Sequence, residues 1–138
     1  MSTRLKEKEE KIQQLLQRLT EEASRGTPIV VEGKKDIEAL KALNVEGNMI
    51  PAKTGGKSLL DLVSEVEKTK AQEVILLLDH DRRGKEWTQR LKHQFEKAGI
   101  TPNLTFWTRL FAIVGREVKD IEGLATYVET LKSMIYNS

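Results

Sequence analysis

Two short apolar runs most restrict how this chain can fold, because neither alternates as a strand with one wet face would. The first is Ile29–Val31, inside a predicted strand at residues 28–32, and the second covers residues 74–78. Strands without alternation are buried on both faces, as they are in parallel sheets covered by helices. We therefore expect a parallel sheet with helices on each side.

Helical patterns alternate with these runs, which is the order that βαβ units require. The predicted strands are residues 28–32, 48–52 and 74–78, and the predicted helices are residues 34–43, 57–70, 86–98 and 121–136. Residues 104–107 are either a fourth strand or, from Trp107 on, the start of a short helix over residues 107–114. The fold class is α/β: a compact domain with about four parallel strands flanked by helices.

Residues 2–25 contain neither proline nor glycine and carry an apolar stripe at helical spacing. The stripe consists of Ile12, Leu15, Leu16, Leu19 and Ala23. We expect residues 1–26 to form an extra N-terminal helical appendage to a domain at residues 27–138. The stripe either packs against its own domain or contacts a second copy or a protein partner.

Both apolar runs end in carboxylates. Glu32 follows the first run, and Asp79 and Asp81 follow the second. Because the carboxyl ends of parallel strands share one edge of the sheet, these acids should meet where open α/β sheets bind ligands. Crowded carboxylates repel each other unless a cation lies among them. An oxygen-only set predicts Mg²⁺, or Mn²⁺, held by Glu32, Asp79 and Asp81.

Glycine and basic residues flank these acids and could hold a phosphate. Free N–H groups at the start of a helix favour such an anion. The candidates for binding phosphate or nucleic acid are Gly33, Lys34, Lys35, Lys57, Arg82 and Arg83. For the two arginines, a role as solvated neutralising charges is an equal alternative.

Residues 55–58, GGKS, follow a predicted strand and are similar to the end of a Walker A loop. The first glycine of that motif is replaced by Pro51, which has no N–H group and cannot adopt a positive φ. We therefore predict no nucleoside triphosphatase activity. Contact between this loop and a nucleic-acid phosphate, through Lys57, is the more plausible role.

The acidic motifs resemble those of the Toprim domain, the metal-binding module of topoisomerases, bacterial-type primases, some nucleases and recombination proteins. The matching residues are Glu32 and Gly33 after a strand, Asp36 three residues later, then Asp79, His80 and Asp81 followed by Gly84. The run DHDRRGKE is similar to the DPDREGE run of topoisomerases, with His80 replacing proline and Arg83 replacing the first glutamate. The resemblance covers residues 27–120 and implies a Rossmann-like Toprim fold.

The resemblance also implies Mg²⁺-dependent phosphodiester chemistry on RNA or DNA, with Glu32 as metal ligand or as catalytic acid or base. Within the family, the chain is most similar to the small ribosomal-RNA maturation nucleases, because both begin with an IVVEGK-like strand. A non-catalytic nucleic-acid-binding or scaffold subunit is the main alternative, and an enzyme acting on a small phosphorylated molecule is the third. We expect neither a topoisomerase nor a primase, whose additional domains we do not find in the sequence.

Three further side chains have simpler explanations. Asp36 should stabilise the start of its helix, Glu86 should pair with Arg90 one turn on, and His80 should be a turn residue beside the acids. Phe106, Trp107 and Phe111 are expected in the core and not on a base-stacking surface.

Composition excludes several other classes. The chain has no cysteine, which excludes disulfides, iron–sulfur clusters and thiolate zinc sites. Its 23 basic and 21 acidic residues nearly cancel, so any nucleic-acid contact must be a local patch. No apolar run approaches the roughly 20 residues that span a bilayer. We expect a soluble, cytoplasmic protein with no membrane partner.

Overall fold

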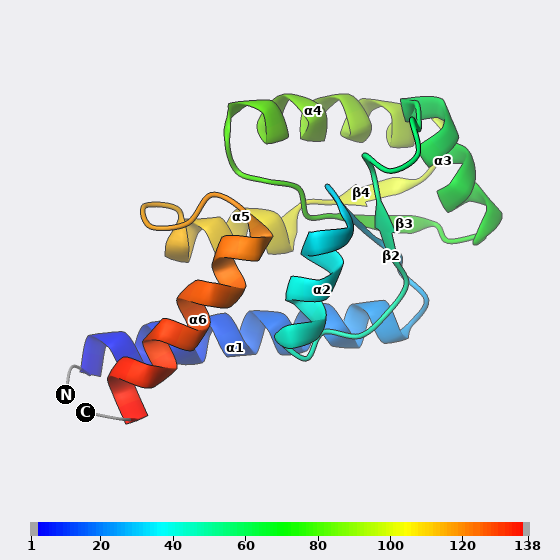
Figure 1. The fold of residues 1–138 in the computed structure, drawn as a ribbon. Coiled ribbons are helices and arrows are strands. Elements are labelled where there is room, and N and C mark those ends of the chain that lie inside the picture. The colour runs from blue at the N-terminus through cyan, green and yellow to red at the C-terminus, as the bar shows by residue number, and fades with distance from the viewer. Residues whose placement is uncertain (1–2, 137–138) are drawn as a thin grey trace.

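The computed structural model describes residues 3–136 and contains a four-stranded parallel sheet in the order β2-β1-β3-β4 (Figure 1). The strands are β1 (Ile29–Val31), β2 (Met49–Pro51), β3 (Glu73–Leu76) and β4 (Thr101–Asn103). The helices are α1 (Thr3–Ser24), α2 (Lys34–Ala42), α3 (Leu59–Lys68), α4 (Arg82–Lys97), α5 (Thr105–Val114) and α6 (Ile121–Tyr136). The predicted α/β fold with a parallel sheet of about four strands is confirmed.

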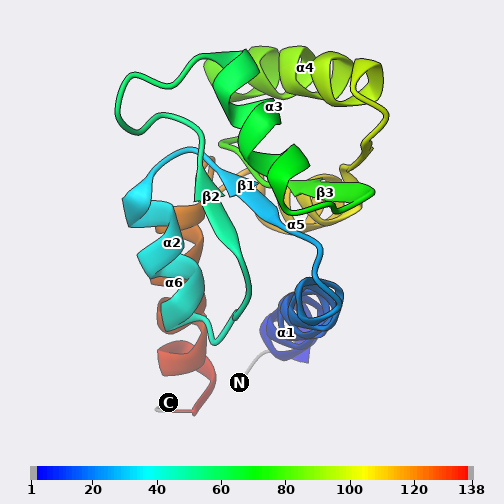
Figure 2. The same ribbon diagram turned by 90° about the vertical axis from the view of Figure 1, so that its right-hand side faces the viewer.

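Helices cover both faces of the sheet, which explains why the strand sequences do not alternate (Figure 2). Ile29, Val31 and Ile75 belong to the core shared with α1, α2, α5 and α6. Val30 and Leu76 point the other way, into the core beneath α3 and α4. The residues of β1, and those of β3 after Glu73, are therefore apolar because both faces of the sheet are buried there.

Helix α1 packs against its own chain. The predicted stripe is entirely buried and shares one core with residues of α5 and α6, such as Leu110 and Leu124. The predicted start of this helix at Ser2 lies outside the described residues. The division into a 1–26 appendage and a 27–138 domain stays a prediction, to be tested by truncation.

Helix α4 begins at Arg82, four residues before the predicted start at residue 86. The Asp81 carboxylate accepts a hydrogen bond from the Gly84 N–H group at 2.7 Å and so caps the helix. Arg82, Arg83 and Gly84 consequently form the first helical turn.

The fourth strand lies at Thr101–Asn103, so the predicted strand at residues 104–107 is wrong and the alternative of a helix is confirmed. The Asn103 side chain accepts a hydrogen bond from the Thr105 N–H group at 2.9 Å, which ends the strand and starts α5. Phe106 and Trp107 then lie in α5 and are buried in the core, as predicted.

The strand order reverses between β1 and β3. From β1 the chain crosses to β2 on one side, and it then returns to β3 on the other side of β1. Ligands bind at such a reversal in open α/β sheets, outside the carboxyl ends of the strands. Pro51 and Pro102 lie in the two outer strands, where a missing N–H group is tolerated.

Candidate metal and phosphate site

Glu32 follows β1 at the point where the strand order reverses, and its side chain is buried, with the residue 7% exposed. The Lys53 ammonium group lies 2.6 Å from Glu32 Oε1. This pairing follows from the sheet, because the hydrogen bonds between β1 and β2 continue into the residues after these strands. The Lys53 N–H group donates to the Glu32 carbonyl at 2.9 Å.

Gly33 and Asp36 shape the turn between Glu32 and α2. The Asp36 carboxylate accepts a hydrogen bond from the Gly33 N–H group at 3.0 Å, so its predicted helix-stabilising role is confirmed. Burial raises the pKa of Asp36 above its ordinary value, and the negative charges of Glu32, Asp120 and Glu122 add to this, while the Gly33 N–H group opposes it. Asp36 is therefore both a cap and a member of an acidic cluster.

Asp79 is held beside Glu32 from the β3 side. The chain beyond β3 stays paired with β1 through Leu77 N–H to the Val30 carbonyl at 2.9 Å. The Trp107 Nε1–H group donates to the Leu78 carbonyl at 2.9 Å, which fixes the backbone just before Asp79. Gly84 then packs directly on Asp79, because a Cβ atom at this position would be 2.0 Å from the Asp79 carbonyl oxygen.

Glu32 and Asp79 form one electrostatic unit. Burial raises the pKa of Asp79 to about 8, and the hydrogen bond and negative charge of Glu32 add to the shift. Burial also raises the pKa of Glu32, but the hydrogen bond from Asp79 and the Lys53 ammonium group outweigh it, so this pKa lies below its ordinary value. At neutral pH the pair therefore holds one proton, on Asp79, and one negative charge, on Glu32.

The pair fits a hard cation. Glu32 Oε2 and Asp79 Oδ1 are buried and receive no hydrogen bond from any other described group. Mg²⁺ takes one or two carboxylates directly and keeps several waters, so two oxygens of this kind suit it. Within residues 3–136 no group of three or more histidine, cysteine or acidic side chains is placed to hold a metal. The structure thus brings together two of the three predicted ligands.

Asp81, the third predicted ligand, is exposed and caps α4 through Gly84 N–H. It lies two residues beyond Asp79, directly before α4, and so caps that helix, whereas Asp79 lies in the segment between β3 and α4. Its part in metal binding stays a prediction.

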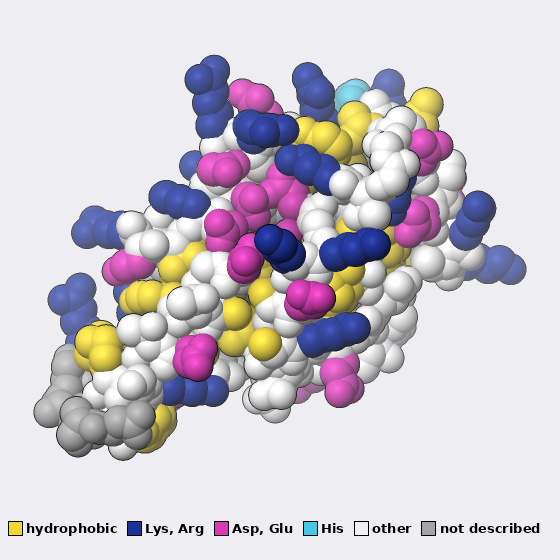
Figure 3. All heavy atoms as spheres, in the orientation of Figure 1, with side chains coloured by type: hydrophobic (Ala, Val, Ile, Leu, Met, Phe, Trp, Pro, Cys, Tyr) yellow, Lys and Arg dark blue, Asp and Glu magenta, His cyan; other side chains and the backbone are white. Residues whose placement is uncertain are grey.

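A cavity of about 380 Å³ surrounds the acid pair. It is lined by Glu32, Gly33, Lys34, Lys35, Asp36, Lys53, Asp79, Asp120 and Glu122. Figure 3 shows acidic side chains gathered over the N-terminal ends of α2 and α6, with lysine and arginine side chains around them. Acids at helix N-termini are stabilised by the helix dipoles, and the surrounding cations suit a phosphate ligand.

The predicted phosphate-binding residues divide into two groups. Gly33, Lys34 and Lys35 line the cavity. Lys57 instead donates to the Pro51 carbonyl at 2.8 Å and pairs with Glu65 at 2.9 Å, inside the loop that it was expected to offer to a ligand.

Arg82 and Arg83 are exposed in the first turn of α4. The predicted pairing of Glu86 with Arg90 is wrong, because Glu86 pairs with Arg82 at 3.4 Å. The helix begins early enough to include Arg82, and this places the two side chains one turn apart.

The sequence reasoning missed Lys53 and Asp120. Lys53 comes directly after a predicted strand, so the rule that the carboxyl ends of parallel strands share one edge could have found it. Asp120 accepts a hydrogen bond from the Gly123 N–H group at the start of α6. Its sequence signal is that of an ordinary helix cap, and only the packing of α6 beside α2 brings it near Asp79.

His80 lies on the other side of the backbone from the acid pair. Its ring stacks on Phe111 with 4.8 Å between centroids, and its backbone N–H group donates to the Lys119 carbonyl at 2.6 Å. Burial and the charges of Lys85 and Lys119 lower its pKa. The predicted turn residue is thus a packed aromatic neighbour of α5.

Comparison with known proteins agrees with this geometry. Residues 27–107 match the Toprim domain family. The chain is 40% identical over 124 residues to a UPF0292 protein of Methanosarcina acetivorans, covering 90% of this chain and 84% of that protein. It is 37% identical over 120 residues to a UPF0292 protein of Methanocaldococcus jannaschii, covering 86% of this chain and 91% of the relative.

A solved structure of a protein from Aquifex aeolicus has the same fold, with a TM-score of 0.66 and 30% identity over 80% of this chain and 94% of that one. No helix between residues 3 and 136 combines the length and the apolar character needed to cross a membrane. The fold is therefore shared with a protein that can be aligned over most of its length.

Proposed function

The chain belongs to the Toprim domain family, and from this premise we propose that it carries out Mg²⁺-dependent chemistry on nucleic-acid phosphodiesters. The observation that carries the proposal is the acid pair at the point where the strand order reverses: Glu32 is buried and Asp79 is half-buried, and each has a buried oxygen that no other described group satisfies. RNA or DNA cleavage in the cytoplasm, with Mn²⁺ as a substitute ion, is the specific activity we propose.

Glu32 and Asp79 would hold the ion, with Asp81 as the additional ligand that the family resemblance implies. When bound, the ion supplies charge stabilisation to the phosphate and to the leaving oxygen. Glu32 is ionised at neutral pH, because Asp79 and Lys53 lower its pKa, so it can accept a proton from an attacking water or hydroxyl group. Asp36 supports this role by fixing the turn that carries Glu32.

Lysines around the cavity provide the contacts that a phosphate needs. Lys34 and Lys35 are exposed at the start of α2, where free backbone N–H groups and the helix dipole also attract an anion. Lys53 holds Glu32 on one side and faces the cavity on the other. Gly33 leaves the approach to these groups open, since no heavy atom lies within 4 Å of where its Cβ would be.

Cleavage assays on labelled RNA, single-stranded DNA and duplex DNA, with Mg²⁺, Mn²⁺ or EDTA, test the proposal. We expect cleavage that requires the ion and falls by roughly 10² or more in Glu32→Gln, which keeps the side-chain shape but cannot accept a proton. Nucleic-acid binding should persist in this variant. Glu38→Gln is the matched control, because Glu38 is an exposed carboxylate on α2, the helix that follows Glu32, and does not line the cavity.

Two outcomes would change the proposal. Absence of cleavage by the wild-type protein across the whole panel would favour a nucleic-acid-binding or scaffold subunit that keeps the metal site. Cleavage that is undiminished in Glu32→Gln would refute the catalytic role of this residue.

A further inference from the structure

A basic groove runs along one side of the molecule between α1 and α5, which lie side by side (Figure 2). It comprises two adjoining cavities, of about 630 Å³ and 280 Å³, which share Ala112 and Ile113 in their walls. The basic residues that line them are Arg4, Lys8, Lys11, Arg18, Arg109, Arg116 and Lys119. Among the described lining residues, Glu117 is the only acid, and it pairs with Lys8 at 3.2 Å.

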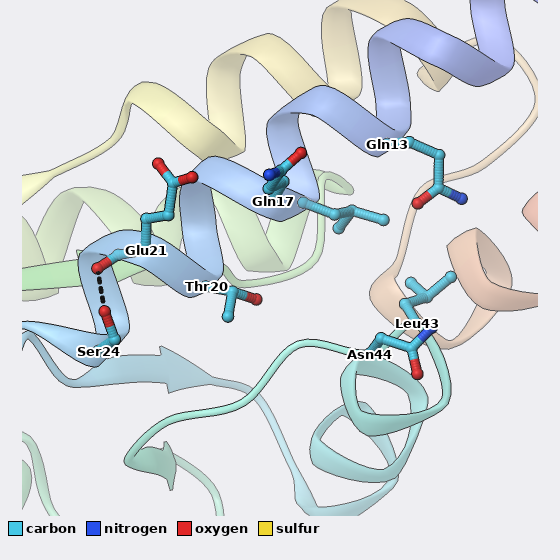
Figure 4. A pocket seen from close by; sticks show the side chains of 8 residues that line it. Gln13, Gln17, Thr20, Glu21, Ser24, Leu43 and Asn44 are labelled. Atoms are coloured by element: carbon cyan, nitrogen blue, oxygen red, sulfur yellow. Dashed lines mark hydrogen bonds between the residues drawn. The ribbon is translucent and has the colours of Figure 1, made fainter.

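Four cations of α1 line the groove. Arg4, Lys8, Lys11 and Arg18 are spaced by four, three and seven residues, so they form one stripe along the edge of the buried apolar face. Figure 4 shows the other flank of α1, where Gln13, Gln17 and other side chains face Leu43 and Asn44. That hollow, of about 400 Å³, has no lysine or arginine among its described lining residues. Among the described residues that line these hollows, the lysines and arginines of α1 are therefore on its α5 side.

The groove and the acid crevice lie back to back. Asp79 lines the crevice, whereas the next residue, His80, lines the groove. In the same way, Asp120 lines the crevice and Lys119 lines the groove. A hydrogen bond from the His80 backbone N–H group to the Lys119 carbonyl, at 2.6 Å, joins the two segments. The groove and the acid crevice therefore meet across these two paired backbone segments.

From this arrangement we infer that the groove between α1 and α5 binds a single strand of nucleic acid and leads it to the acid crevice. The inference rests on the proposed function. Basic residues along the walls match the regular negative charge of a phosphodiester backbone. Ala112 and Ile113 provide apolar surface between the charges for sugars and bases.

A single strand fits the site better than a duplex does. Glu32 is 7% exposed, so a phosphodiester must bend into a recess to reach it. A duplex is stiff over tens of base pairs, and bending it sharply costs several kcal/mol, whereas a single strand bends freely. The groove gives such a strand a continuous set of contacts outside the recess.

The test measures binding and cleavage separately in the full-length protein. Binding of a fluorescently labelled single-stranded oligonucleotide is followed by anisotropy in EDTA, where cleavage cannot occur. The groove variant combines Lys11→Gln, Arg18→Gln and Arg109→Gln, which are exposed residues. The matched control combines Lys68→Gln, Arg90→Gln and Lys97→Gln, exposed cations of α3 and α4 on the opposite face of the sheet, with the same change in net charge.

We expect the groove variant to bind about 10- to 100-fold more weakly near 0.1 M salt and the control to bind within a few fold of wild type. The slope of log affinity against log salt should fall by about 2 in the groove variant, as the loss of three phosphate contacts requires. A charge-conserving variant, with Lys11→Arg, Arg18→Lys and Arg109→Lys, should bind like wild type. This result would separate charge from any effect on folding.

Equal losses in the groove and control variants would overturn the inference, as would wild-type affinity in the groove variant. A preference for duplex over single strand would also overturn the inference. So would complete displacement of the oligonucleotide by an acidic polypeptide at equal charge concentration. If the wild-type protein cleaves but the groove variant binds as well as wild type, the groove inference fails and the proposed function stands. If binding depends on the groove as expected but the wild-type protein does not cleave, the proposed function fails and the groove inference stands.

Discussion

The turn after β1 and the turn after β3 each deliver a carboxylate to the same crevice, but they differ in how tightly they are packed. In the first turn, Gly33 has extended backbone angles, φ −148° and ψ −178°, and no heavy atom within 4 Å of an added Cβ. In the second, an added Cβ on Gly84 would be 2.0 Å from the Asp79 carbonyl oxygen.

The difference separates two reasons for a glycine in a motif. Gly84 is explained by the interior of the protein, because α4 could not otherwise start against the Asp79 backbone. Gly33 has no such internal reason, since any residue could adopt its backbone angles and a side chain would meet no described neighbour. The open space at Gly33 faces the cavity and is therefore available to a ligand.

Alanine substitutions at the two glycines should give the largest contrast. Gly84→Ala forces a backbone shift and should lower the free energy of unfolding by about 1–3 kcal/mol, as overpacking does. Gly33→Ala should change it by less than about 0.5 kcal/mol. Denaturant unfolding followed by circular dichroism measures both. Similar losses at the two positions would show that the turns are packed alike.

The two aspartates of the second turn offer the next test. Asp79→Asn should weaken Mg²⁺ binding roughly 10- to 100-fold, because asparagine cannot lose a proton and so cannot present a charged oxygen to the ion. Asp81→Asn should weaken it only a few fold and should preserve folding, because asparagine also caps helices. Isothermal titration calorimetry on both variants measures the affinities. An equal loss in Asp81→Asn would mean that this carboxylate turns from α4 to the ion, as the sequence predicts.

The smallest effect concerns pH. The pKa of Asp79 is raised to about 8, so Mg²⁺ must displace its proton at neutral pH. Affinity should rise with pH by at most about tenfold per unit below pH 8 and then level off. Titrations at pH 7 in buffers of different ionisation enthalpy should detect release of about one proton. Asp79→Asn should release none, and pH-independent affinity in the wild type would contradict the shared proton.

The same shifts set the sign of the stability change in metal-free protein. The folded state holds a proton on Asp79 between its ordinary pKa of 3.8 and about 8, which the unfolded state does not. The free energy of unfolding should therefore decrease as pH rises through this window. Glu32, whose pKa is lowered, contributes stability that is present above its ordinary pKa of 4.5 and is lost as pH falls through the lower folded value.

Sequence reasoning succeeded where a local pattern has one physical explanation. Doubly buried strands required helices on both faces, and the carboxyl ends of parallel strands brought Glu32 and Asp79 together. Gly33, Lys34 and Lys35 reached the cavity for the same reason, as direct continuations of β1.

It failed where one side chain could serve two purposes. Asp81 could ligate or cap, and only the start of α4 decides between them. Lys57 could face a phosphate or hold its loop, and the nearby Glu65 and Pro51 carbonyl decide that. Asp120 and the basic groove depend on helices that are distant in sequence, so no local pattern predicts them.

The two outer strands each contain a proline and are only three residues long. An edge of this kind offers few free N–H groups to an incoming chain, so the sheet is a poor template for adding strands from another molecule. Protection against sheet-to-sheet aggregation is thus built into both margins of the domain. Any assembly that this protein forms must be made through its helices and loops, and a growing filament of paired strands is disfavoured from the start.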